Sequence, residues 1–238
     1  MNPGRLSILL RRLALAVTLS TLASGVEPNQ LTPEEQRNGW ILLFNGHDLT
    51  GWRSFGKPEA PKAGWSAENG WLHHAAKGGG GDLITTQTFT NFDLVFDWRI
   101  APGGNSGLKY FIDERRGAPI GHEYQLIDDA AHPDAKVGPK RQTAALYDAL
   151  PPVGAPVRPA GETNTSRIRI RGPEVEHWLN GVRVLGYTVG SPELAAAKAA
   201  SKFKDEAKWG TVFATPLLLQ DHGDAVWFQN LKLRVLGP

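Results

Sequence analysis

Two of the four Asn-Gly dipeptides in this sequence place the strongest constraint on how the chain can fold. They stand at 69–70 and 180–181, and each lies between two short stretches of apolar or alternating residues. Asn-Gly in that setting is the preferred sequence of a two-residue turn joining antiparallel strands. We therefore expect β-hairpins over residues 64–74 and 174–186, and hence antiparallel sheets.

Similar strand-like stretches recur along the rest of the chain. The 27 Gly and 17 Pro residues are spread between them, which is typical of a protein with many turns. The clearest stretch is Phe92–Ile100, in which every second residue is apolar. The expected strands are 39–44, 64–68, 71–74, 82–86, 92–100, 108–112, 121–128, 143–147, 166–171, 174–179, 182–186, 216–220 and 226–235.

Helical signals are few. Ser191-Pro192-Glu193 predicts a helix that runs from about 192 to 204, and Thr32-Pro33 predicts a short helical turn. Roughly a dozen strands with one helix indicate an all-β fold, a sandwich of two antiparallel sheets. Apolar residues make up 41% of the chain, enough for a sizeable core. No repeat or linker divides the pattern, so we expect one domain over 39–238 after an N-terminal segment at 26–38.

The first residues have the layout of an export signal. Three arginines within the first 12 residues precede the apolar run 13–22 and the small residues 23–25. This predicts a signal peptide over 1–25 and a periplasmic or secreted protein, the alternative being an N-terminal membrane anchor. The chain has no cysteine, which excludes disulfides and a lipid-attachment cysteine. Beyond the export signal we expect no membrane association.

The charge balance argues against nucleic acid as a partner. Removing the signal takes away three arginines, so the 26 basic residues become 23 against 24 acidic ones, a net charge of −1. A near-neutral protein lacks the positive field that attracts a phosphate backbone.

The expected strand Gly121–Asp128 has the most unusual polar pattern. Because side chains alternate along a strand, Glu123 and Gln125 share one face. A carboxylate beside an amide offers a proton acceptor next to a group that both donates and accepts hydrogen bonds, and sugars are bound by such groups. The alternative is an ordinary polar outer face of an antiparallel sheet.

Further polar groups stand near the ends of other expected strands. The chain has no GxSxG, no HExxH and no cysteine, so the usual hydrolytic nucleophile and zinc motifs are absent from the sequence. No cofactor is predicted, although Asp221, His222 and Asp224 could hold a divalent cation; a turn rich in Asp and Gly is the simpler reading. The polar candidates are Asn105, Ser106, Lys109, Asp128, His177, Gln220, Asp221 and His222.

Several motifs, in order, resemble the 3-keto-disaccharide hydrolase family over about 39–236. They are GWILLFNG from Gly39 with LTGW from Leu49, GGDL from Gly80, NSG from Asn105, EYQLID from Glu123, HWLNG from His177 and LQDHG from Leu219. The resemblance implies a concanavalin A-like jelly-roll sandwich and activity on glycosides whose glucose unit carries a ketone at C3. The ketone acidifies the proton at C2, so one base and one polarising partner would suffice.

The resemblance also implies roles for the polar candidates. Glu123 is expected to act as base or acid, His222 with Asp221 as a second proton-transfer pair, and Lys109 as the group that polarises the ketone. The expected sugar-binding residues are Asn105, Ser106, Gln125, Asp128, Tyr147, His177, Trp178 and Gln220. Trp178 could instead fill the core, and His222 could merely cap a turn. The chain departs from the family pattern with Thr163 in place of Trp and Gln229 in place of Arg.

Two other functions fit the same fold. A lectin-like carbohydrate-binding module would show a flat aromatic strip without a buried carboxylate. A conventional glucanase would place a second carboxylate at glycosidase distance from Glu123, and Asp221 is the candidate for it.

Overall fold

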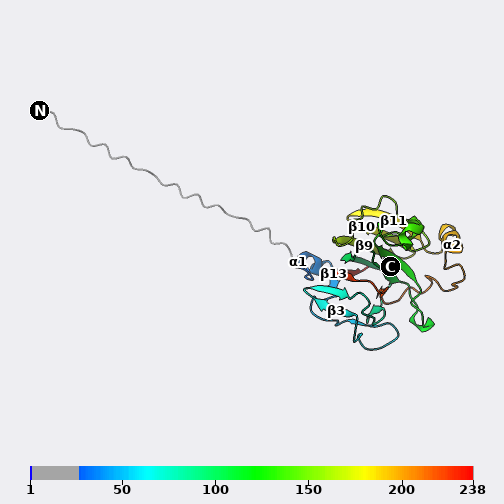
Figure 1. The fold of residues 1–238 in the computed structure, drawn as a ribbon, viewed down its shortest axis with the longest axis horizontal. Coiled ribbons are helices and arrows are strands. Elements are labelled where there is room, and N and C mark those ends of the chain that lie inside the picture. The colour runs from blue at the N-terminus through cyan, green and yellow to red at the C-terminus, as the bar shows by residue number, and fades with distance from the viewer. Residues whose placement is uncertain (2–26, 238) are drawn as a thin grey trace.

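The computed structural model describes residue 1 and residues 27–237 (Figure 1). Apart from Met1, the predicted signal peptide therefore lies outside the described residues. Within those residues, no helix is both long and apolar enough to span a membrane. The strands are β1 (Trp40–Leu42), β2 (Trp52–Ser54), β3 (Trp65–Glu68), β4 (Trp71–His74), β5 (Leu83–Thr85), β6 (Phe92–Ile100), β7 (Asn105–Tyr110), β8 (His122–Ile127), β9 (Asn164–Arg171), β10 (Glu174–Leu179), β11 (Val182–Thr188), β12 (Leu218–Leu219) and β13 (Val226–Val235).

Two sheets form the molecule, which confirms the predicted all-β jelly-roll sandwich. The eight-stranded sheet has the order β11-β10-β9-β6-β13-β4-β3, with β1 also paired to β13, and the five-stranded sheet has the order β2-β5-β12-β7-β8. Every neighbouring pair is antiparallel. Both Asn-Gly hairpins form, as β3–β4 and β10–β11, with Asn69 and Asn180 at positive φ as the turn requires.

The core lies between the sheets, and it follows from the alternation along each strand. The apolar residues that alternate along β6 all face inward and are buried, as are Leu108 and Leu126 of the facing sheet. Burial of this apolar surface is the main force that holds the sheets together.

A polar chain also crosses this interior. His177 Nε2 lies 2.7 Å from the Tyr110 hydroxyl, which lies 2.7 Å from the Tyr187 hydroxyl, which lies 2.8 Å from His122 Nδ1. Burial lowers the pKa of His177 to about 4 and that of His122 to about 3. Both rings are therefore neutral at pH 7, as a buried imidazole without a carboxylate partner must be.

Two expected elements differ from the structure. Residues 143–147 form no strand; Leu146 makes only isolated bridges, because Ala144 and Asp148 take left-handed φ values and break the extension. The helix α2 (Pro192–Ala199) is shorter than the predicted 192–204. The chain turns at Ser201, whose hydroxyl donates to Lys198 O and accepts the N–H of Phe203.

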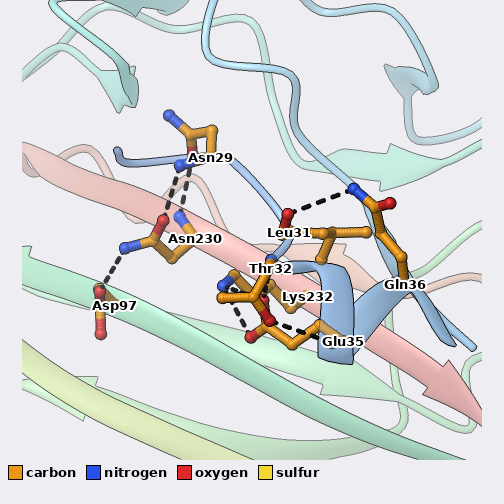
Figure 2. Close-up of polar contacts among 8 residues, drawn as sticks. All are labelled: Asn29, Leu31, Thr32, Glu35, Gln36, Asp97, Asn230 and Lys232. Atoms are coloured by element: carbon orange, nitrogen blue, oxygen red, sulfur yellow. Dashed lines mark hydrogen bonds and ion pairs between the residues drawn. The ribbon is translucent and has the colours of Figure 1, made fainter. Parts of the chain in front are cut away.

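The N-terminal segment packs on the outer face of the eight-stranded sheet (Figure 2). Thr32 and Glu35 form a capping box on α1 (Pro33–Arg37), as the Thr32-Pro33 signal predicts. Glu35 also pairs with Lys232 of β13 at 2.8 Å. Asn29 and Asn230 exchange two bonds, each donating its backbone N–H to the side-chain oxygen of the other. Figure 1 shows α1 beside β13, with α2 on the opposite side of the molecule.

Candidate active site

Strands β7 and β8 place four predicted residues on the outer face of the five-stranded sheet. The register pairs Lys109 with Glu123, and Gly107 with Gln125. Directly opposed residues in an antiparallel pair point to the same side, and so do residues two apart on one strand. Asn105 therefore lies on this face too. All four side chains, of Asn105, Lys109, Glu123 and Gln125, are buried although they face away from the core.

Glu123 is held by two neighbours. Its Oε2 lies 3.6 Å from Lys109 Nζ. The Gln220 amide satisfies both groups when its nitrogen donates to Glu123 Oε1 at 3.3 Å and its oxygen accepts from Lys109 Nζ at 3.1 Å. These residues line a cavity of about 300 Å³ whose other wall includes Lys202 and Phe203. Glu206 also lines this hollow, but its carboxylate is paired with Arg116. Glu123 is thus the carboxylate that lies between Lys109 and Gln220, in a hollow large enough for a sugar ring.

Gly107 makes this arrangement of Glu123 sterically feasible. A Cβ at position 107 would lie 2.3 Å from Glu123 Oε1 and 2.9 Å from its Cδ. The carboxylate therefore lies directly over the bare backbone of β7, where any other residue would displace it.

Two buried acceptors on the same face have no partner among the described residues. They are Gln125 Oε1 and Asn105 Oδ1. A buried polar atom without a hydrogen bond costs about 1–3 kcal/mol, so these two acceptors favour a water or ligand hydroxyl that can donate to them. Hydroxyl groups of a sugar would satisfy both atoms.

Asp221 and His222 do not form the predicted proton-transfer pair. The Asp221 carboxylate accepts the N–H groups of Gly81 and Gly223 and lies 3.1 Å from His74 Nε2. His222 is exposed, and its Nε2 lies 3.4 Å from Asn105 Nδ2. Within residues 27–237, no hydrogen bond or ion pair joins the two side chains. Asp221 fixes a loop, and it is also unavailable as the second glycosidase carboxylate.

The group that could hold a cation keeps two of the three expected residues, His222 and Asp224, and has His132 in place of Asp221. His132, His222 and Asp224 bring one donor atom each within 4.8 Å of one another. However, His132 Nδ1 accepts the Asp134 N–H at 3.1 Å, so the proton of the neutral ring is on Nε2. Coordination would require this ring to change tautomer and lose that bond. The arrangement favours a hydrogen-bonding cluster, and a cation remains a prediction.

Four predicted binding residues lie away from the cavity. Ser106 faces inward and donates to Gln220 O, and Asp128 accepts the N–H groups of the turns on either side of it. His177 is in the core, where it contacts Tyr110 and Ala144 O. Trp178 lies on the outer face of the other sheet, over Arg167. Alternation along β10 puts these last two residues on opposite faces, and neither face is that of Glu123.

Tyr147 contacts Glu123 and Lys202 but does not line the cavity, and two residues near Glu123 were missed by sequence reasoning. Its backbone N–H donates to Glu123 O, its hydroxyl donates to Asp134, and its ring lies 4.1 Å from Lys202 Nζ. Asp82 lies at the start of β5, close enough to Lys109 and Glu123 to interact with their charges, and burial raises its pKa. Its position directly before a strand was a usable signal. Lys202 follows a helix in an irregular segment and carries no such signal.

The 3-keto-α-glucoside-1,2-lyase-like domain family matches residues 39–234. This chain belongs to that family. The 3-keto-disaccharide hydrolase of Bacteroides thetaiotaomicron is 34% identical over 93% of this chain and 87% of its own length. A candidate glycosyl hydrolase from Parabacteroides distasonis is 35% identical, with a TM-score of 0.81 over 89% of this chain and all of its own. A second one from the same organism is 26% identical, with a TM-score of 0.61 over 83% of this chain.

Both departures from the family pattern lie outside the Glu123 cavity. Gln229 is on β13 of the other sheet, where its amide donates to Gly70 O in the first hairpin turn. Thr163 precedes β9 and offers its carbonyl to Arg158. Neither lines the cavity.

Proposed function

We propose that this protein is a carbohydrate-active hydrolase that cleaves glycosidic bonds of 3-keto-glycosides, with Glu123 as the base. The observation that carries the proposal is the buried Glu123 carboxylate, held by Lys109 and Gln220 over Gly107 in a sugar-sized cavity. Family membership supports the substrate class, because the relative from B. thetaiotaomicron bears the name 3-keto-disaccharide hydrolase.

The chemistry needs only one base. Glu123 takes the proton from C2, and the electron pair of that bond delocalises onto the oxygen of the C3 ketone. The resulting enolate collapses to a C1–C2 double bond as the bond from C1 to the glycosidic oxygen breaks. The departing oxygen takes up a proton. Water then adds its oxygen to C1 and a proton to C2, so the sum is hydrolysis.

The two other functions fit the site less well. A binding module would offer an exposed aromatic strip, whereas Glu123 is 5% exposed within a hollow. A conventional glucanase needs a second available carboxylate. Asp221 is occupied by backbone N–H groups, and Glu206, the other carboxylate that lines the cavity, is paired with Arg116. The predicted signal peptide would place the reaction in the periplasm or outside the cell.

The test compares Glu123→Gln with Glu114→Gln on a 3-keto-glucoside, following the released sugar with and without a chelator. Glu114 is a matched control, since it is an ion-paired carboxylate in the segment between β7 and β8 that is bound by Arg53 and does not line the cavity. We expect Glu123→Gln to lose at least about 100-fold in rate with its fold intact, and Glu114→Gln to retain activity. An unchanged rate in Glu123→Gln refutes the role. Cleavage of the unoxidised glucoside at the same rate refutes the substrate class.

A further inference from the structure

The cavity presents two lysines to Glu123, and their surroundings differ. An ammonium group has three N–H donors. Lys109 Nζ faces three acceptors: Pro119 O at 3.3 Å, Glu123 Oε2 at 3.6 Å and the Gln220 amide oxygen at 3.1 Å. Lys109 therefore has no donor left for a substrate oxygen unless it releases Glu123 or its neighbours. Its geometry suits holding the carboxylate in place.

Lys202 has the opposite arrangement. Its Nζ lies 4.1 Å from the ring centre of Tyr147 and 5.0 Å from that of Phe203. In the described part of the chain, no hydrogen bond or ion pair engages this ammonium. Aromatic faces attract a cation without using its N–H groups as carboxylates do. Lys202 is an exposed residue that lines the cavity, so its donors remain available to a substrate oxygen.

The backbone of Lys202 is fixed. Its N–H donates to Asp148 Oδ2 at 2.7 Å, and Asp148 is itself bound by Arg141 at 2.7 Å. The side chain thus extends from an anchored point toward the cavity that Glu123 lines. Desolvation lowers the pKa of Lys202, while the negative charge of Glu123 opposes that effect.

We propose that the Lys202 ammonium is the electrophile that stabilises negative charge on the C3 oxygen, and that Lys109 is a positioning residue for Glu123. This proposal rests on the proposed function. As Glu123 takes the C2 proton, the electron pair of the C2–H bond becomes the C2–C3 double bond. The carbonyl pair moves onto the C3 oxygen, which accepts a hydrogen bond from Lys202. When the C1–O bond breaks, the carbonyl re-forms and Lys202 is unchanged.

The physical reason is the state of the donors before substrate arrives. A transition-state oxyanion is best stabilised by donors that are already in place and not committed to another acceptor. Lys202 meets this condition and Lys109 does not. The sequence-based assignment of carbonyl polarisation to Lys109 is therefore replaced here by Lys202.

The experiment uses Lys202→Met, Lys202→Arg and Lys204→Met in the full protein. Lys202 and Lys204 are both exposed, but Lys204 lies outside the cavity, so its variant controls for loss of one charge. Two rates are measured with a 3-keto-glucoside: release of sugar, and exchange of the C2 proton for deuterium by NMR. The second rate reports the proton transfer directly.

We expect Lys202→Met to lower both rates about 100-fold or more, with little change in KM. Lys202→Arg should recover part of the loss because a guanidinium also donates to an oxyanion. Lys204→Met should equal the parent protein. Equal thermal unfolding of all variants shows that the fold is intact.

Two outcomes separate the proposals. If Lys202→Met keeps both rates within about threefold while Glu123→Gln loses them, the role of Lys202 is overturned and the proposed function stands. If the parent protein neither releases sugar nor exchanges the C2 proton, the proposed function itself fails. A Lys202→Met variant with a raised KM and an unchanged rate constant would also refute the role, because it would show ground-state binding only.

Discussion

The outer faces of the two sheets differ in how their buried polar groups find hydrogen-bond partners. On the eight-stranded sheet, the buried Asp93 carboxylate uses both oxygens, with Arg167 at 2.6 Å and Arg234 at 3.1 Å. On the five-stranded sheet, the equally buried Gln125 and Asn105 keep acceptors without partners. Both faces arise from the same strand alternation. The Asp93 carboxylate is satisfied by side chains of the protein, whereas the acceptors of Gln125 and Asn105 have no partner within residues 27–237.

The largest expected difference between the two faces is the loss of stability when Asp93 is replaced. Replacing Asp93 with Ala leaves two arginines without their shared partner, and we expect a loss of about 3–5 kcal/mol in the free energy of unfolding. Turnover per folded molecule should be unchanged, because this face does not contact the cavity. Urea denaturation measures the first quantity, and rates corrected for the folded fraction measure the second. A loss of turnover without a loss of stability would reverse the comparison.

Lowering the pH should destabilise the protein through the two histidines, His177 and His122, that are buried between the sheets. The pKa values of His177 and His122 are lowered by burial to about 4 and about 3, below the ordinary value of 6.5. Below pH 6.5 the unfolded chain therefore binds protons that the folded chain does not. Stability is full above pH 6.5 and falls as the pH drops toward 4, by about 1.4 kcal/mol per pH unit for each histidine. Urea denaturation between pH 7.5 and 5 measures this slope, and His177→Leu should reduce it.

Gly107→Ala tests the floor of the cavity. The added methyl group must displace the Glu123 carboxylate, which is the nearest side chain to it. Since a displacement of about 1 Å can cost up to 100-fold in rate, we expect kcat/KM to fall at least about 10-fold. The free energy of unfolding should change by less than about 1 kcal/mol, because Glu123 can rotate. Gly237→Ala, which meets no neighbour, is the control. Normal kinetics in Gly107→Ala would show that Glu123 acts from another position.

The smallest effect on stability should come from Gln125→Met, and it sharpens the contrast with Asp93. The substitution removes an acceptor that has no partner, so we expect the free energy of unfolding to stay equal or to rise by up to about 1 kcal/mol. The KM for a 3-keto-glucoside should rise about 10-fold, since a sugar hydroxyl loses its acceptor. A destabilised protein with an unchanged KM would mean that Gln125 is structural.

The sequence was sufficient to predict the features that depend on neighbouring residues alone, namely strand alternation and hairpin turns. The period of two placed Glu123 and Gln125 on one face, and the Asn-Gly turns fixed two hairpins. The same alternation predicts that His177 and Trp178 point to opposite faces of their strand. It does not predict which sheet contains that strand, or which of its faces is buried.

Contacts between segments far apart in the sequence were not predictable. The Asp221 carboxylate contacts His74, which lies 147 residues earlier in the chain (221 − 74), and it does not pair with His222 as expected. Lys202 reaches the cavity only because the chain after α2 turns at Ser201 and is anchored by Asp148. No residue type or spacing near Lys202 in the sequence predicts that turn or that contact.

The reciprocal Asn29–Asn230 bonds bear on how the protein can be attached to anything else. They fix the start of the described domain against β13, on the side of the sandwich opposite to Glu123. A tag, a surface or a second protein joined directly to residue 27 would therefore be attached on the face opposite to Glu123, and the Glu123 cavity would stay unobstructed.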